Sequence, residues 1–136
     1  MPATLKLEVV TPEGNVCSED VEMVTLPGIE GELGVYPMHV PLVTEIVPGE
    51  IALRRNGQDQ FLAVGPGFAA ITGDRVAVLT DMAIRADDLD DARIEQARQA
   101  AENRLRERLG DADAAVVNAS IARSIEHLRG RRRSHR

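Results

Sequence analysis

Hydrophobic and polar residues alternate with a period of two along the first part of the chain. Residues 5–9 (Leu-Lys-Leu-Glu-Val) and 21–24 (Val-Glu-Met-Val) follow this pattern. It is typical of strands that bury one face. Several short strands at such spacing predict a β-sandwich or a barrel.

Two β-hairpins are indicated by their turns. Residues 51–55 and 60–64 flank Asn56-Gly57, and residues 68–72 and 75–80 flank Gly73-Asp74. Asn-Gly is the stronger of the two turn signals, because both central positions of a type I′ turn need positive φ.

After Arg85 the chain has the composition of helices, mostly Ala, Arg, Glu and Gln. Gly110 fits a C-cap with positive φ, so two helices joined at this residue are predicted. Asp90 can cap the first helix, and Asp111 or Asp113 the second. The expected apolar stripes are Ala97, Ala100, Ala101, Leu105 and Leu109 on the first helix, and Val117, Ile121, Ile125 and Leu128 on the second. Facing stripes predict an antiparallel hairpin.

These patterns divide the chain into two domains, a β-domain at residues 1–87 and a helical hairpin at residues 88–136. All seven prolines lie in the first part. Charge divides in the same way: residues 1–88 carry 5 Lys and Arg against 14 Asp and Glu, and residues 89–136 carry 11 against 8. Because the first helix offers mostly alanine to its contacts, we expect a hairpin that can detach, extend or be captured by a partner.

Composition excludes several classes of protein. With 43% hydrophobic and 28% charged residues in 136, the chain is typical of a folded globular protein. No stretch approaches the roughly 20 apolar residues of a membrane helix, and the first ten residues lack the features of a signal peptide. We therefore expect a protein kept inside the cell, without direct insertion into a membrane. The 2% of aromatic residues and the acidic larger domain argue against a nucleic-acid partner.

The candidate chemistry is sparse. Cys17 is the single cysteine, so it forms no internal disulfide, and we interpret it as a half-buried hydrophobic residue. His39, His127 and His135 lack partners at metal-ligand spacing, so no metal site is expected. Gly65-Pro66-Gly67 lacks the Lys and the Ser or Thr of a phosphate loop, and no nucleophile motif is present. We therefore expect no catalytic residues.

The segment at residues 31–43 is the most distinctive one. Two glycines and two prolines constrain its backbone around Tyr36 and His39. It closely resembles the signature of the epsilon-subunit family of F-type ATP synthases, and five further segments are similar to that family: residues 9–14, 21–24, 64–68, 76–79 and 86–90. The resemblance covers nearly the whole chain in the same order.

The resemblance implies an N-terminal β-sandwich of about ten strands followed by an antiparallel two-helix hairpin. It also implies a non-catalytic rotor subunit that binds the gamma subunit and the c-subunit ring and helps to couple proton translocation to ATP synthesis. Such a subunit is peripheral, on the cytoplasmic face of the inner (plasma) membrane. The residues that match the c-ring and gamma contact are Gly31, Glu32, Gly34, Tyr36 and His39.

In bacterial relatives the hairpin restrains ATP hydrolysis when it extends towards the catalytic alpha and beta subunits. Arg123 and Arg129 are suited to such inhibitory contacts. No cofactor is required, but some relatives bind ATP as a regulatory ligand, and the residues that match their site are Leu89, Asp90, Arg93 and Arg123. Ile84, Ile94 and His127 depart from the pattern of that site. The alternative interpretation is that Asp90 caps a helix and Arg93 is solvated.

Two rival functions remain. A small β-domain hydrolase would need a nucleophile and a base in one cleft, and the sequence offers no candidate pair. A stand-alone nucleotide-binding sensor would share the segment from Leu89 to Arg93 but would not need gamma or the c-ring.

Overall fold

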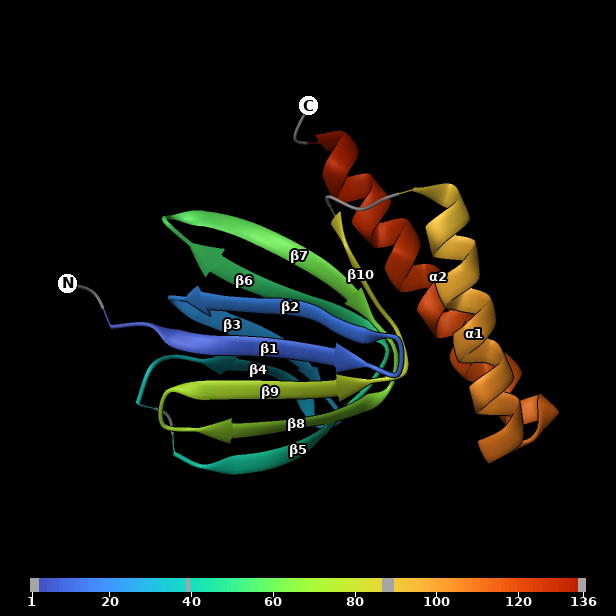
Figure 1. Cartoon of the computed structure of the whole chain (residues 1–136), viewed down its shortest axis with the longest axis horizontal. Coiled ribbons are helices and arrows are strands. Elements are labelled where there is room, and N and C mark those ends of the chain that lie inside the picture. Colours follow the sequence, from blue (N-terminus) through green and yellow to red (C-terminus); the bar gives the residue numbers. More distant parts are fainter. Residues whose placement is uncertain (1–2, 39, 87–89, 135–136) are drawn as a thin grey trace.

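A computed structural model of the chain describes residues 3–38, 40–86 and 90–134, with side chains as far as Gly130. Within them, ten strands are followed by the helices α1 and α2 (Figure 1). The expected fold class, a β-sandwich followed by a helical hairpin, is confirmed. The elements are β1 (Leu5–Thr11), β2 (Gly14–Val21), β3 (Met23–Gly28), β4 (Gly31–Val35), β5 (Leu42–Ile46), β6 (Gly49–Arg55), β7 (Gln58–Val64), β8 (Gly67–Thr72), β9 (Arg75–Thr80), β10 (Ala83–Arg85), α1 (Asp91–Leu109) and α2 (Asp111–Ser134).

The strands form a continuous sheet that folds into two layers. Its order is β10-β7-β6-β3-β5-β8-β9-β1-β2, with β4 paired to β3. One layer contains β2, β1, β9, β8 and β5, and the other contains β10, β7, β6, β3 and β4 (Figure 1). The layers are joined where Gly28 of β3 pairs with Ile46 of β5. β1 and β9 pair in parallel, whereas the other strand pairs of the described residues are antiparallel.

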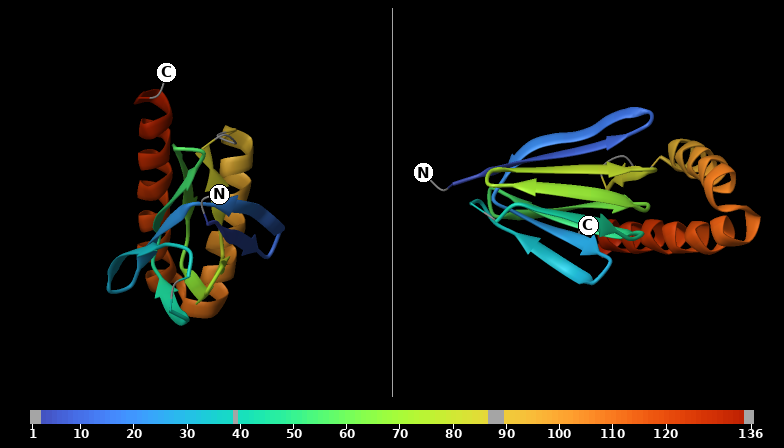
Figure 2. Two further views of the ribbon diagram at one scale, coloured as in Figure 1. Left: turned by 90° about the vertical axis from the view of Figure 1, so that its left-hand side faces the viewer. Right: turned by 90° about the horizontal axis from the view of Figure 1, so that it is seen from below.

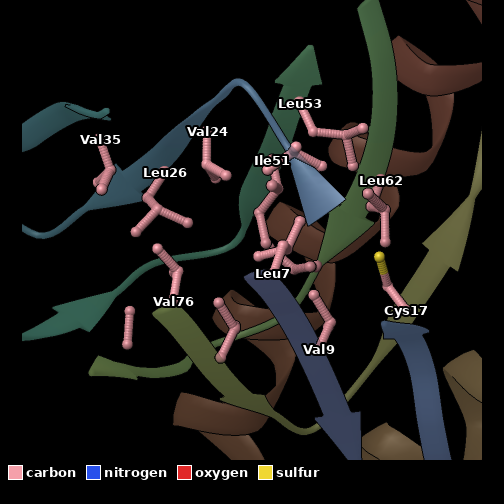
Figure 3. Close-up of a cluster of buried hydrophobic side chains, with 14 of the residues drawn as sticks. Leu7, Val9, Cys17, Val24, Leu26, Val35, Ile51, Leu53, Leu62 and Val76 are labelled. Carbon is pink, nitrogen blue, oxygen red and sulfur yellow. The ribbon is translucent and has the colours of Figure 1, made fainter. Parts of the chain in front are cut away.

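The core between the layers is aliphatic. Inward-facing side chains alternate with outward-facing ones, as in β1, where Leu5, Leu7 and Val9 are buried. Figure 3 shows Leu7 and Val9 meeting side chains of the opposite layer. Cys17 belongs to this core with 2% of its surface exposed. Burial, with the charge of Glu19 adding to it, raises the pKa of the Cys17 thiol, so this residue packs as a hydrophobic side chain.

Both predicted β-hairpins are confirmed. β6 and β7 pair around Asn56 and Gly57, whose φ angles are 53° and 76°, as a type I′ turn requires. β8 and β9 pair around Gly73 and Asp74.

α1 begins and ends where its capping residues predict, whereas Asp111 and Asp113, which were predicted to cap the second helix, lie inside the first turn of α2. Asp90 accepts a 2.9 Å hydrogen bond from the backbone nitrogen of Ala92, and Gly110 ends α1 with a φ of 84°. Along α1, Leu105 is buried as expected, but Ile94 is buried without having been predicted, and Leu109 is 41% exposed. Leu109 lies at the last position of α1, beyond the reach of the cluster that covers Leu105.

The predicted stripe on α2 is buried at Ile121, Ile125 and Leu128 and half-buried at Val117. The two helices lie side by side and antiparallel, outside the layer that contains β10 and β7 (Figures 1 and 2). α2 packs on β6 and β7. A second apolar cluster fills this interface, made of Ala63, Met82, Ile84, Ile94, Ala101, Leu105, Ala114, Ile121, Ile125 and Leu128.

β7 is therefore covered on both faces. Leu62 and Val64 face the sandwich core, whereas Ala63 faces the hairpin. The uninterrupted apolar run at residues 61–64 is the sequence signal of such two-sided burial. The predicted domain boundary between residues 87 and 88 lies outside the described residues.

Candidate functional site

The β3–β4 hairpin carries three of the residues predicted to contact other subunits. Gly28 and Gly31 pair across its two-residue turn, and Gly31 has a φ of 120° that favours glycine. A Cβ on Gly28 would lie 2.7 Å from the Gly31 carbonyl oxygen, so the turn has no room for a side chain there. Glu32 follows with an exposed side chain, and Gly34 packs against Met23. The turn thus holds an exposed carboxylate on a constrained backbone.

Tyr36 lies at the other end of β4 and is 59% exposed. The segment after it is anchored to the β8–β9 turn, because the Met38 nitrogen donates a 2.6 Å hydrogen bond to the Gly73 carbonyl. His39 lies outside the described residues. The predicted contact residues are therefore spread along β4, with Gly31 and Glu32 at one end and Tyr36 at the other.

An exposed apolar surface covers the outer face of β8 and β9. Phe68 and Leu79 are cross-strand partners, 58% and 59% exposed. Val43 of β5 adds a further side chain that is 73% exposed. This surface was not predicted from the sequence, although alternation along β8 places Phe68 at an outward position. Apolar surface of this kind often marks a protein contact.

Those of the predicted ATP-binding residues that the structure describes lie at the start of α1 and on α2. Arg123 donates a 2.9 Å hydrogen bond to the Ser120 hydroxyl. It lines a pocket of about 290 Å³ between α2 and the start of β6, together with Pro48, Gly49, Glu50, Ser120, Ser124 and His127. Asp90 and Arg93, both described and both exposed, are not among its lining residues. Leu89 lies outside the described residues.

The three departures from the ATP-binding pattern have clear places in the structure. Ile84 and Ile94 are buried in the apolar cluster beneath the hairpin, where a charged side chain would be costly. His127 lines the same pocket as Arg123. The Glu50 carboxylate at this pocket would repel phosphate groups.

Arg129, the second predicted inhibitory residue, is engaged within the hairpin. Its Nη2 lies 2.9 Å from Oδ1 of Asp91, and its Nη1 lies 3.5 Å from Oε1 of Glu126. It therefore joins α2 to the first turn of α1.

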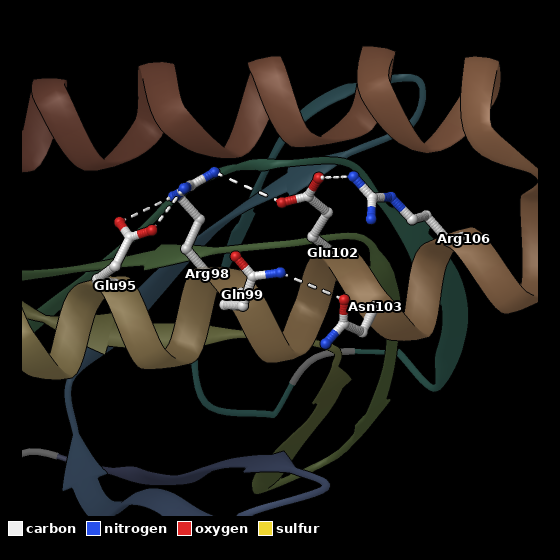
Figure 4. A network of polar contacts seen from close by, with 6 residues as sticks. All are labelled: Glu95, Arg98, Gln99, Glu102, Asn103 and Arg106. Carbon is white, nitrogen blue, oxygen red and sulfur yellow. Dashed lines mark hydrogen bonds and ion pairs between the residues drawn. The ribbon is translucent and has the colours of Figure 1, made fainter.

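A ladder of charged and amide side chains runs along α1 (Figure 4). Arg98 contacts Glu95 at 2.6 Å and Glu102 at 3.8 Å, and Arg106 contacts Glu102 at 2.6 Å. The hydrogen bond from Arg98, together with its charge, lowers the pKa of Glu95. These contacts at helical spacing stabilise α1 itself.

No group of three or more His, Cys, Asp or Glu side chains in the described part of the chain could hold a metal ion. None of the helices, as far as they are described, is both long and apolar enough to cross a membrane.

Known proteins resemble both parts of the chain. A family model described as "ATP synthase, Delta/Epsilon chain, beta-sandwich domain" matches residues 4–86. The chain belongs to the ATP synthase delta/epsilon family. A relative named ATP synthase epsilon chain, from Herpetosiphon aurantiacus, is 40% identical over 124 residues, which cover 91% of each chain. A second of the same name, from Laribacter hongkongensis, is 39% identical over 139 aligned residues, covering 98% of this chain and 99% of the relative.

Solved structures share the fold of this family member. A chain in the Euglena gracilis mitochondrial ATP synthase, described as OSCP/F1/c-ring, has a TM-score of 0.66 at 22% identity, with 93% of this chain and 82% of that chain covered. A chain in the Tetrahymena thermophila mitochondrial ATP synthase, described as central stalk/c-ring, has a TM-score of 0.52 at 11% identity, with 75% and 91% covered. The family resemblance found in the sequence is thus confirmed.

Proposed function

We propose that this chain is a non-catalytic central-stalk subunit of an F-type ATP synthase, turning with the rotor and coupling proton translocation to ATP synthesis. The observation that carries the proposal is the 40% identity to an ATP synthase epsilon chain, which extends over 91% of this chain and so includes sequence beyond the sandwich. Both structural neighbours are described as parts of assemblies that include the c-ring, and one of them as part of the central stalk. The subunit would be peripheral, held on the cytoplasmic face of the inner membrane by its partners.

Gamma and the c-subunit ring are the proposed partners of the sandwich. The contact residues are Gly31, Glu32, Gly34, Tyr36 and His39. An exposed carboxylate beside a constrained turn supports this assignment, because it can form charge-assisted hydrogen bonds with basic or polar loops of a ring. Glu32→Gln in the reconstituted enzyme should lower ATP-driven proton pumping while leaving ATP hydrolysis in place. Glu30→Gln, at the neighbouring turn position, is the matched control, and equal pumping by both variants and the wild type would contradict the assignment.

The hairpin is the proposed inhibitor of ATP hydrolysis, acting on the catalytic alpha and beta subunits through Arg123 and Arg129. Deleting residues 89–136 should leave the complex assembled and raise its ATPase activity. Loss of assembly would show a structural role for the hairpin instead. Because the deletion uncovers the apolar outer face of β7, Arg123→Ala with Arg129→Ala in the full chain provides the second test. Unchanged ATPase activity in that variant would contradict the inhibitory contacts.

ATP is the proposed regulatory ligand of the compact hairpin, bound through Leu89, Asp90, Arg93 and Arg123. Isothermal titration of the full-length subunit tests this directly. Micromolar to low-millimolar binding that Arg93→Ala abolishes, and Arg98→Ala does not, would support an ATP-sensing hairpin. Absence of binding would mean that the ATP site has been lost through the substitutions at Ile84, Ile94 and His127. Gamma, the catalytic subunits and the proton-motive force would then determine whether the hairpin is compact or extended.

Copurification with a membrane-bound ATPase tests the central-stalk function against a stand-alone nucleotide sensor. A central-stalk subunit should copurify in a fixed ratio to gamma. A sensor would bind ATP and be recovered alone.

A further inference from the structure

Two arginines on α1 reach from the hairpin to two turns of the sandwich. Arg104 Nη1 lies 2.8 Å from Oε1 of Glu13 in the β1–β2 turn, and its Nη2 donates to the carbonyl oxygen of Asp81. Asp81 lies between β9 and β10. Arg108, one helical turn further along, places its Nη2 2.7 Å from Oδ2 of Asp81. One guanidinium thus bridges both turns, and a second one strengthens the contact with Asp81.

Hydrogen bonds within both turns order the chain around the groups that these arginines contact. The Thr11 hydroxyl accepts a 3.3 Å hydrogen bond from the Glu13 nitrogen and so helps to hold that turn. The Thr80 hydroxyl is buried within 2.9 to 3.2 Å of the carbonyl oxygens of Gly65, Pro66 and Met82, which orders the chain on either side of Asp81. The side chain of Asp81 is 11% exposed, and the Nε of Arg104 is buried without a partner among the described residues. The Asp81 end of the contact is therefore largely withdrawn from water, whereas the side chains of Glu13 and Arg108 are 53% and 59% exposed. Charge-assisted hydrogen bonds are stronger at the buried end than at an open surface.

α1 itself adds few large apolar side chains to the interface. α1 buries Ile94, Ala101 and Leu105, one of which is an alanine with little surface to bury. The other ion pairs found on α1, with Arg98, Arg106 and Arg129, stay within the hairpin. Those pairs can persist when the hairpin leaves the sandwich as a unit, whereas the bonds of Arg104 and Arg108 must break.

We propose that Arg104 and Arg108, bound to Glu13 and Asp81, form a latch that sets the equilibrium between the docked and the undocked hairpin. They are positioning residues, acting through the placement of α1. The consequence of the latch for ATP hydrolysis rests on the proposed inhibitory function, whereas the docking equilibrium itself does not.

The latch is tested on the full-length subunit with a distance measurement. Spin labels at Ser18→Cys on β2 and Ala112→Cys on α2, in a Cys17→Ala background, report the docked distance. Arg104→Gln, alone and with Arg108→Gln, should raise the ratio of undocked to docked molecules on the order of fivefold to tenfold. Arg106→Gln is the matched control, because Arg106 contacts Glu102 within α1, and it should leave the ratio unchanged.

Two further measurements separate a latch from a general loss of stability. Arg104→Lys keeps the positive charge but loses the planar guanidinium group. Its ratio of undocked to docked molecules should therefore lie between those of the wild type and Arg104→Gln. Raising the salt concentration should increase undocking in the wild type and have little effect on the double variant. Hydrogen exchange in β1, β8 and β9 should stay at the wild-type level, which shows an intact sandwich.

An unchanged ratio in both the single and the double variant would overturn the latch, whatever the ATPase activity. Increased undocking with unchanged ATPase activity in the reconstituted complex would support the latch and contradict the proposed inhibition by the hairpin.

Discussion

Arg129 and Asp91 join the two helices at the open end of the hairpin, with 2.9 Å between Nη2 and Oδ1. Asp91 is 90% exposed at its side chain, and Arg129 is 36% exposed. An ion pair as exposed as this one contributes at most about 1 kcal/mol. Arg129 can therefore exchange its partner for an acidic group on another subunit at small cost.

Asp91→Asn should strengthen inhibition, because it releases Arg129 while leaving the rest of the hairpin in place. We expect lower ATPase activity of the reconstituted complex, with a loss of less than about 1 kcal/mol in the free energy of unfolding. Arg129→Ala should have the opposite effect on activity. Equal ATPase rates for Asp91→Asn, Arg129→Ala and the wild type would show that Arg129 takes no part in inhibition.

Gly67 should tolerate no side chain. A Cβ at this position would lie 1.9 Å from the carbonyl oxygen of Leu79 on the paired strand. Gly67→Ala forces β8 and β9 apart, and we expect it to lower the free energy of unfolding by about 1 to 3 kcal/mol in urea denaturation. Gly73→Ala is the control, since its Cβ would meet nothing within 4 Å. A midpoint for Gly67→Ala equal to that of Gly73→Ala would contradict this account of the β8–β9 contact.

The cap at Asp90 can be separated from its predicted role in ATP binding. Asp90→Ala removes the acceptor for the Ala92 nitrogen and should cost about 1 kcal/mol, seen as faster hydrogen exchange in the first turns of α1. Asp90→Asn keeps a capping oxygen and removes the charge. If Asp90 binds ATP through its charge, titration should show weaker binding in both variants, whereas slow exchange is kept in Asp90→Asn. Fast exchange in Asp90→Asn would contradict the capping role.

Docking of the hairpin should weaken in acid. Burial by itself would raise the pKa of Glu13, but the hydrogen bond and the charge of Arg104 outweigh it and lower this pKa below its ordinary value of 4.5. A carboxyl group whose pKa is lowered by folding contributes stability above its unfolded pKa and loses it as the pH falls through the folded value. The distance between spin labels on β2 and α2 should therefore show undocking as the pH falls below 4.5.

Glu13→Gln should remove this part of the pH dependence. Glu95→Gln is the control: the pKa of Glu95 is also lowered, by Arg98, but that pair lies within α1 and does not reach the sandwich. An acid response in Glu13→Gln as steep as in the wild type would assign the effect to other carboxyl groups.

The features predicted correctly from the sequence depend on residues close together along the chain. The Asn56-Gly57 turn, the cap at Asp90 and the end of α1 at Gly110 each follow from the backbone preferences of one or two residues. Ile94 was missed as a buried residue because it lies near the start of α1, before the alanine stripe that indicated the buried face. Its burial depends on Met82 and Ile84, with which it shares a cluster.

The candidate site also has one part that could be predicted from the sequence and one part that could not. The constrained turn at Gly31 could be expected from its glycines and neighbouring prolines, whereas the cross-strand pair of Phe68 and Leu79 appears when β8 and β9 are placed in register. Arg93 and Arg123 both match the ATP-binding pattern of some relatives, and in the structure Arg123 lines a pocket together with His127. Helical spacing does not specify how far apart two helices place their exposed side chains.

By itself the sequence determined the class of fold, the order of strands before helices, the main turns and caps, and membership of the ATP synthase delta/epsilon family. Each of these depends on periodicity, on the conformational preference of single residues, or on a string of neighbouring residues. Tertiary structure alone decided which layer the hairpin covers and which residues hold it there. Glu13 and Arg104 are 91 positions apart, and their meeting depends on the packing of α2 on β7. The apolar run at residues 61–64 indicates that β7 is covered on both faces, but no local preference specifies which element covers it.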